Sequence, residues 1–213
     1  MVGSLSAIPV VPVIPAIRAI PTAPLPLPSP RRPLGPADRA RRWYENELGW
    51  ATVPGAPVRL VVGRCFDVLD VPLEAGRATL RRLGTCPGVP KSPVAVQGDR
   101  MRLLVAAGSA EELPGLLRWL EWDALDLDLV GLGAGALMDA PPLPGAGART
   151  YPQGAAEWLR PPESGGEVES SLPTMSAQGA GGGAPDLVRL VRTAATQCHR
   201  VRLRHTRGRS PVR

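Results

Sequence analysis

Apolar side chains recur three and four residues apart in four stretches of the chain, the spacing that places them on one face of an α-helix. In the first stretch, residues 36–50, Tyr44 and Leu48 follow this spacing. Asp38 is the expected N-cap of that helix, and Gly49 its expected end. The same spacing predicts further helices over residues 73–83, 110–122 and 186–204.

Short apolar runs, several of them alternating with polar residues, lie between these helices and predict β-strands. Gly98 and Asp99 separate two of the runs and favour a hairpin there. The strands are expected at residues 51–54, 58–62, 65–71, 93–97, 101–105, 125–130, 136–138 and 158–160. This mixture predicts an α+β fold, a mixed sheet flanked by helices, rather than a barrel or a bundle.

Glycine and proline divide the chain into segments. Ten of the 26 prolines fall in the first 36 positions, so residues 1–35 are expected to be a proline-rich, disordered tail. Residues 36–162 are the expected domain and 163–185, rich in Gly, Ser and Pro, a flexible linker. Residues 186–213 form the expected basic helix and tail, whose packing on the domain stays open.

Composition narrows the class of protein. The formal charge is +6, and Lys91 is the only lysine, so arginine supplies almost all of the positive charge. Prolines interrupt the apolar N-terminus, which argues against a signal peptide or a membrane span. Three cysteines without metal-like spacing suit a reducing compartment. We therefore expect a soluble, cytoplasmic protein without membrane contact.

Two pairs of aspartates are the candidates for metal chemistry. Asp67 and Asp70 are three residues apart, so they point to opposite faces of a regular strand and cannot jointly hold an ion without a bulge. Asp126 and Asp128 are two apart and share a face. That second pair predicts either a metal site or the wet face of a half-exposed strand, and the sequence leaves both open.

Several short motifs together resemble the N-terminal primase-polymerase domain of bifunctional DNA primase/polymerases. The first is Trp43-Tyr44 with Leu48-Gly49-Trp50 and a short strand before Pro54. A strand with Asp70, a hairpin near Arg100, an Asp128 motif running to Pro142 and a Trp158 ending follow in that family's order. The resemblance covers about residues 37–162 and implies a primase-polymerase-like fold.

The resemblance also implies the family's metal-binding positions. Asp70 matches the first acid and Asp128 the third, whereas Pro72 stands at the second acid and Met101 near the hairpin histidine. Neither Pro72 nor Met101 can bind Mg²⁺ or Mn²⁺, and Glu74 replaces the missing acid only if the chain bends after Pro72. The resemblance thus implies a degenerate member that has lost catalysis.

Three functions remain open at this point. The first is a nucleic-acid- or nucleotide-binding or regulatory module, in which Arg77, Arg81, Arg100 and Arg102 meet DNA phosphate and the basic residues 200–213 add salt-dependent affinity. The second is an active DNA primase/polymerase that uses Mg²⁺ or Mn²⁺ for nucleotidyl transfer. The third is an interaction module that offers its proline-rich tail to a protein partner.

Overall fold

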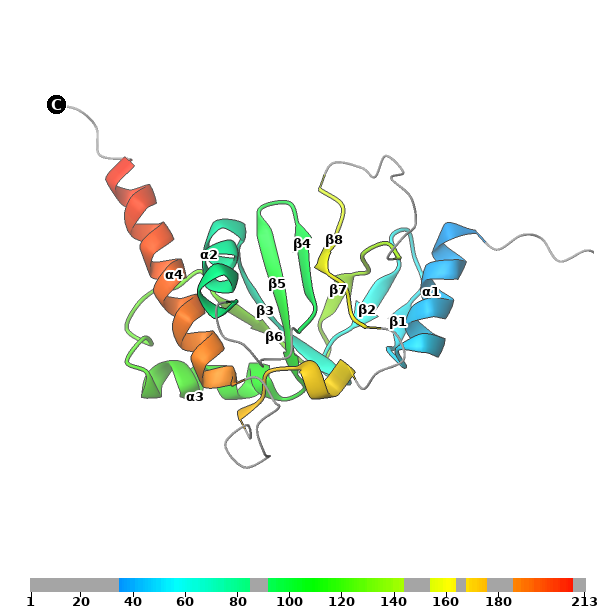
Figure 1. Cartoon of the computed structure of the whole chain (residues 1–213), viewed down its shortest axis with the longest axis horizontal. Helices are drawn as coiled ribbons and strands as arrows, with labels where there is room; N and C mark the ends of the chain where they lie inside the picture. Colours follow the sequence, from blue (N-terminus) through cyan, green and yellow to red (C-terminus); the bar gives the residue numbers. More distant parts are fainter. Residues whose placement is uncertain (1–34, 85–91, 144–153, 164–167, 176–185, 209–213) are drawn as a thin grey trace, which may run out of the picture. The chain divides into compact units, whose positions relative to one another are not determined.

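The computed structural model describes residues 35–84, 92–143, 154–163, 168–175 and 186–208. Figure 1 shows the elements they form. The helices are α1 (Pro36–Glu47), α2 (Leu73–Leu83), α3 (Ser109–Trp119), the 3₁₀ helix η1 (Val168–Ser171) and α4 (Leu187–Gly208). The strands are β1 (Thr52–Val53), β2 (Arg59–Val61), β3 (Phe66–Pro72), β4 (Val94–Gln97), β5 (Arg100–Ala106), β6 (Val130–Leu132), β7 (Leu137–Asp139) and β8 (Glu157–Arg160).

The strands form two separate sheets. One has five strands in the order β6-β3-β5-β4-β8, and the other has three in the order β1-β2-β7. Every neighbouring pair is antiparallel. The α+β class is therefore confirmed, but the expected mixed sheet is wrong among the described residues. Short connections such as the Gly98–Asp99 turn, where Gly98 has φ +59°, favour antiparallel neighbours.

Strand β3 is central to the larger sheet. It pairs with β5 along its whole length and with β6 on its other edge. Leu69 and Val71 point to one face and join the core beneath the helices, whereas Phe66 and Val68 point to the other and join a second core. A nearly continuous apolar run is what a strand covered on both faces requires.

Helices α2, α3 and α4 cover one face of the five-stranded sheet (Figure 1). Their apolar side chains and those of the strands make the larger core, in which Leu69, Met101, Val105 and Val191 are fully or almost fully buried. Gly76 of α2 permits the close approach, because a Cβ atom there would lie 2.8 Å from the Cβ of Met101.

The second core lies on the other face of β3 and is rich in aromatic rings. Tyr44, Trp50 and Phe66 are buried in it, and the Trp50 and Phe66 ring centroids are 4.5 Å apart. The Tyr44 hydroxyl donates to the Pro141 carbonyl at 2.7 Å and accepts from Trp158 Nε1 at 2.9 Å. Burial raises the pKa of Tyr44, so this hydroxyl keeps its proton and its donor role.

The C-terminal helix packs on the domain, which the sequence left open. Asp186 caps it by accepting hydrogen bonds from the backbone N–H groups of Val188 and Arg189 at 2.8 and 3.3 Å. One stripe of α4 is buried against α2 and α3: Leu187, Leu190, Val191, Ala194, Ala195, Cys198 and Val201. Residues 34–213 accordingly form one compact unit.

Three local expectations differ from the structure. Residues 125–129 make bends and irregular backbone, and only Val130 of the expected strand belongs to β6. Helix α1 begins after Gly35 with no side-chain cap, so Asp38 lies in its first turn instead of capping it. Within the expected linker, η1 is present and Leu172 is 2% exposed in the aromatic core.

Other expectations fall on residues that the structure does not describe. The proline-rich tail is one of them, apart from Gly35, and so is much of the linker. Among the described residues, no helix combines the length and the apolar character that crossing a membrane requires.

Candidate functional site

Asp70 lies on β3, on the sheet face opposite the three helices. The antiparallel register places it beside Arg102 of β5 and places Pro72 beside Arg100. Residues two apart on a strand share a face, so both arginines point to the side of Asp70. Met101, between them, points the other way into the helix-covered core. Even a histidine at position 101 would therefore lie on the wrong side of the sheet to join Asp70.

Both arginines bind Asp70. Arg100 Nε lies 2.5 Å from Asp70 Oδ1, and Arg102 Nε lies 3.3 Å from Asp70 Oδ2. The side chains are 25%, 16% and 12% exposed for Arg100, Arg102 and Asp70, so water screens these contacts only weakly. Both carboxylate oxygens are engaged by guanidinium groups.

Arg100 also joins Asp128, which stands just before β6. Its Nη1 lies 2.7 Å from Asp128 Oδ1, so one guanidinium bridges the two carboxylates that the resemblance matched to metal ligands. Burial by itself would lower the pKa of Arg100, but its hydrogen bonds to Asp128 and Asp70 outweigh that effect and raise it. Asp70 and Asp128 are thus brought together, with a fixed cation between them.

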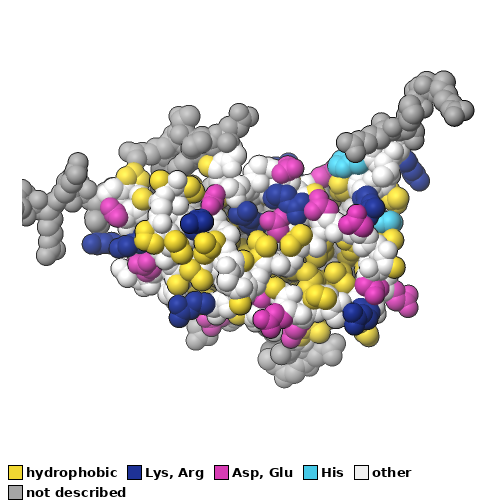
Figure 2. All heavy atoms as spheres, turned by 180° about the vertical axis from the view of Figure 1, so that it is seen from behind, with side chains coloured by type: hydrophobic (Ala, Val, Ile, Leu, Met, Phe, Trp, Pro, Cys, Tyr) yellow, Lys and Arg dark blue, Asp and Glu magenta, His cyan; other side chains and the backbone are white. Residues whose placement is uncertain are grey.

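A polar layer continues from this cluster across β4. Gln97 pairs with Arg100 in the β4–β5 register and donates through Nε2 to Asp139 Oδ2 at 2.8 Å. Gln97 Oε1 and Arg102 Nη1 are buried without a hydrogen-bond partner within the described residues. Figure 2 shows Lys/Arg and Asp/Glu side chains lying among hydrophobic ones on the face of the molecule turned away from the viewer of Figure 1.

The other candidate acids lie elsewhere. Glu74 is half exposed on α2 and lies 2.5 Å from Arg204 Nη1 of α4. Asp67 is buried on the helix-covered face, opposite Asp70, as their spacing predicts, and its Oδ2 accepts the backbone N–H of Ala110 at 2.9 Å. Among the described residues, no three His, Cys, Asp or Glu side chains are grouped so that they could hold a metal ion.

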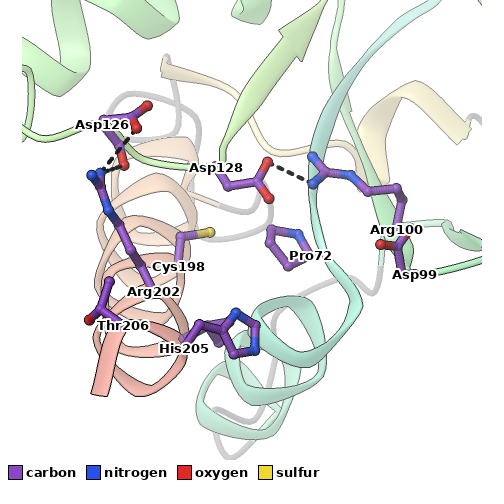
Figure 3. A pocket seen from close by; sticks show the side chains of 10 residues that line it. Pro72, Asp99, Arg100, Asp126, Asp128, Cys198, Arg202, His205 and Thr206 are labelled. Atoms are coloured by element: carbon purple, nitrogen blue, oxygen red, sulfur yellow. Dashed lines mark hydrogen bonds and ion pairs between the residues drawn. The ribbon is translucent and has the colours of Figure 1, made fainter. Parts of the chain in front are cut away.

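Beside the Arg100–Asp128 pair is a groove between the sheet and α4 (Figure 3). Its first compartment has a volume of about 490 Å³. In Figure 3 the side chains of Cys198 and His205 extend from α4 toward Pro72, whereas Arg202 extends toward Asp126. The full lining is Pro72, Asp99, Arg100, Asp126, Asp128, Cys198, Val201, Arg202, His205 and Thr206.

A second compartment of about 460 Å³ adjoins the first on the side of α2. The two share Pro72, Asp99, Val201 and His205, so they form one continuous groove. Arg77 and Arg81 line the second compartment, together with Leu73 and Glu74.

Charge is unevenly distributed along this groove. At the β6 end Asp126 and Asp128 are each paired with an arginine, Arg202 and Arg100. At the α2 end Arg77 and Arg81 are exposed, and neither has an ion pair within the described part of the chain. The β6 end therefore holds carboxylates that are paired with arginines, whereas the α2 end presents two guanidinium groups without ion pairs among the described residues.

The sequence did not indicate that α4 builds this groove. The helical spacing of the α4 residues that line it does place them on one stripe of the helix: Cys198, Val201, Arg202 and His205. The sequence did not indicate which surface of the domain that stripe faces. Gln97 and Asp139 were also missed, because a contact between them depends on the register of β4 with β5 and on the position of β7.

Comparison with known proteins gives no match to this chain, either among family models, among curated proteins or among solved structures.

Proposed function

We propose that the chain is a nucleic-acid-binding module without nucleotidyltransferase activity. One observation carries this proposal. Arg100 and Arg102 occupy the carboxylates of Asp70 and Asp128, whereas Arg77 and Arg81 face an open groove with no acidic partner among the described residues. Both oxygens of Asp70 are committed to internal pairs, and Arg77 and Arg81 remain as available positive charge.

A divalent metal ion is a poor competitor for these acids. It would have to displace a guanidinium from a mostly buried carboxylate, leaving Arg100 and Arg102 without their counter-charge. Removing one partner of a buried ion pair costs about 3–5 kcal/mol. Mg²⁺ also loses its water ligands reluctantly and is usually held by carboxylates together with substrate phosphates.

Helix α4 extends the basic surface beyond the groove. Arg200 and Arg207 are exposed on it, and residues 200–213 contain six arginines, one histidine and no acid. Arginine holds phosphate through two parallel N–H donors, which makes the helix and the groove suitable for a phosphodiester backbone. Binding of this kind weakens steeply with salt, because counterions are released from the nucleic acid.

Binding of the full chain to labelled single- and double-stranded oligonucleotides tests the proposal. We expect binding at low salt that Arg200→Gln/Arg207→Gln weakens. The matched control is Arg42→Gln/Arg59→Gln, which removes the same charge from exposed positions on α1 and β2. Failure of the full chain to bind either oligonucleotide would contradict the proposal, as would equal weakening by the two double variants.

Primer extension with Mg²⁺ or Mn²⁺ tests the absence of catalysis. The specific observation that favours an active enzyme is the meeting of Asp70 and Asp128 at one guanidinium. We expect no nucleotide incorporation. Incorporation that Asp70→Ala abolishes would show that Arg100 yields its place to metal ions and would overturn the proposal.

A further inference from the structure

We infer that the groove between α2, α4 and the β4–β5 turn holds one nucleotide, with its phosphate at Arg77 and Arg81 and its base toward Asp128. This inference rests on the proposed function and specifies it, because it assigns a ligand class and an orientation to one part of the basic surface.

The size of the groove suits such a ligand. Its compartments of about 490 and 460 Å³ are each within the range of about 300–1,000 Å³ that small-molecule sites occupy. They meet at Pro72, Asp99, Val201 and His205. A ligand with two chemically different ends can therefore extend from one compartment into the other.

The α2 compartment presents the phosphate-binding groups. Arg77 and Arg81 are one helical turn apart, so their side chains project from the same face of α2. His205 lines the same compartment from α4 and adds a ring N–H donor. Of the two acids in this compartment, Glu74 is neutralised by Arg204 at 2.5 Å, and Asp99 lies at the boundary shared with the first compartment.

The junction between the compartments is partly apolar. Pro72 and Val201 line it beside Asp99 and His205, and Cys198 lines the adjoining part of the first compartment. Burial raises the pKa of Cys198 to about 12, so the thiol stays uncharged at neutral pH. Because Cys198 and Val201 are almost fully buried, the apolar contact available to a base here comes mainly from the partly exposed Pro72.

The β6 compartment presents hydrogen-bond acceptors. Asp128 uses Oδ1 for Arg100, and its side chain is 60% exposed, which leaves Oδ2 accessible from the groove. Asp99 lines the groove nearby from the hairpin turn. Carboxylates accept from exocyclic amino groups, which adenine and cytosine carry and uracil lacks.

The two ends together discriminate between ligands. Inorganic phosphate or a featureless polyanion would gain at the arginines but would meet carboxylates at the β6 end. A nucleotide whose base carries an amino group satisfies both ends in one orientation. The groove should therefore prefer AMP and CMP to UMP, and all three to ribose 5-phosphate.

Calorimetric titration of the full chain with these four compounds tests the inference. We expect AMP and CMP to bind about tenfold more tightly than UMP, the gain expected from one hydrogen bond to a charged acceptor. Asp128→Ala should remove this preference. Arg77→Gln/Arg81→Gln should weaken AMP binding at least tenfold, whereas the control Arg42→Gln/Arg59→Gln should leave it unchanged.

A variant that fills the groove provides an independent check. Thr206 is exposed and lines the first compartment, so Thr206→Trp should block the base without removing any charge. Circular dichroism of each variant reports whether the fold is kept, and the preference of Asp128→Ala for AMP over UMP is a ratio that a general loss of stability does not change.

The outcomes separate the inference from the proposed function. Equal binding of AMP, UMP and ribose 5-phosphate overturns the inference, and so does AMP binding that survives Arg77→Gln/Arg81→Gln. DNA binding without measurable AMP binding overturns the inference and leaves the proposed function intact. AMP binding with the expected preference but no binding of either oligonucleotide supports the nucleotide site and overturns the nucleic-acid proposal.

Discussion

Arg100 determines what the residues around it can do. Its guanidinium contacts both Asp70 and Asp128, so their positions at one end of the sheet produce an internal charge network. The family resemblance implied a common metal site for these two aspartates, and the structure joins both of them to Arg100. The sequence could not show that arginines hold them, because the pairing depends on the register of β3 with β5.

Removing the charge of Asp70 should destabilise the fold. Asp70→Asn leaves the poorly exposed Arg102 without its counter-charge and Arg100 with Asp128 alone. We expect a loss of about 3–5 kcal/mol in the free energy of unfolding, the usual cost of breaking a buried pair. Urea denaturation measures it.

The control for Asp70 is Asp126, which is paired with Arg202 but whose side chain is 91% exposed. Asp126→Asn should change the free energy of unfolding by less than about 1 kcal/mol. Equal effects of the two substitutions would mean that the Asp70 network contributes no more than a surface pair.

The charge of Asp67, unlike that of Asp70, should lower the free energy of unfolding, and its effect should depend on pH. Burial raises the pKa of Asp67, and its hydrogen bond from Ala110 only partly offsets this. A carboxyl whose pKa is higher in the folded state costs stability at pH values above that pKa. The cost disappears as the pH falls through the folded pKa toward the unfolded value of about 3.9.

Asp67→Asn should therefore stabilise the protein more at pH 7 than at pH 4. Asparagine keeps an acceptor for Ala110 and carries no charge. Urea denaturation of both proteins across this pH range measures the difference in the free energy of unfolding. A difference that stays constant with pH would contradict the assignment of this effect to Asp67.

At the scale of elements, the sequence predicted some segments and not others for identifiable reasons. Helix α2 has the bounds that periodicity predicted, because its apolar and charged faces are cleanly separated. Residues 125–130 alternate Leu and Asp, yet only Val130 and the residues after it pair with β3. Alternation of apolar and polar residues indicates which side chains are buried. A β-strand also requires an adjacent strand to form hydrogen bonds with its backbone.

The packing of α2 on the sheet depends on Gly76. An alanine Cβ there would lie 2.8 Å from Met101 Cβ, too close for an ordinary contact, so Gly76→Ala should lower the free energy of unfolding by about 1–3 kcal/mol. Gly115 of α3 has nothing within 4 Å of such a Cβ. Gly115→Ala should raise stability by about 0.5–1 kcal/mol, because alanine favours the helix. Thermal unfolding distinguishes the two, and stabilisation by both would contradict the close packing of α2.

At the scale of the whole molecule, the charged groups that pair inside the fold lie apart from the basic groups that a ligand can reach. The acids at the end of the sheet are bound by arginines of β5, whereas the basic residues of α2 and α4 face the groove and solvent. The sequence indicated a basic C-terminal segment but left its place open. That place follows from the buried stripe of α4, whose partners on α2 and α3 are more than 60 residues away along the chain.

The salt dependence of DNA binding tests most directly the claim that this surface binds phosphate. The slope of log K against log salt is about −0.9 per phosphate contact for duplex DNA. Loss of Arg77 and Arg81 should therefore reduce its magnitude by about 1.8, whereas Arg42→Gln/Arg59→Gln should leave it unchanged. A full chain whose binding does not vary with salt, or a slope that Arg77→Gln/Arg81→Gln leaves unchanged, would contradict the account.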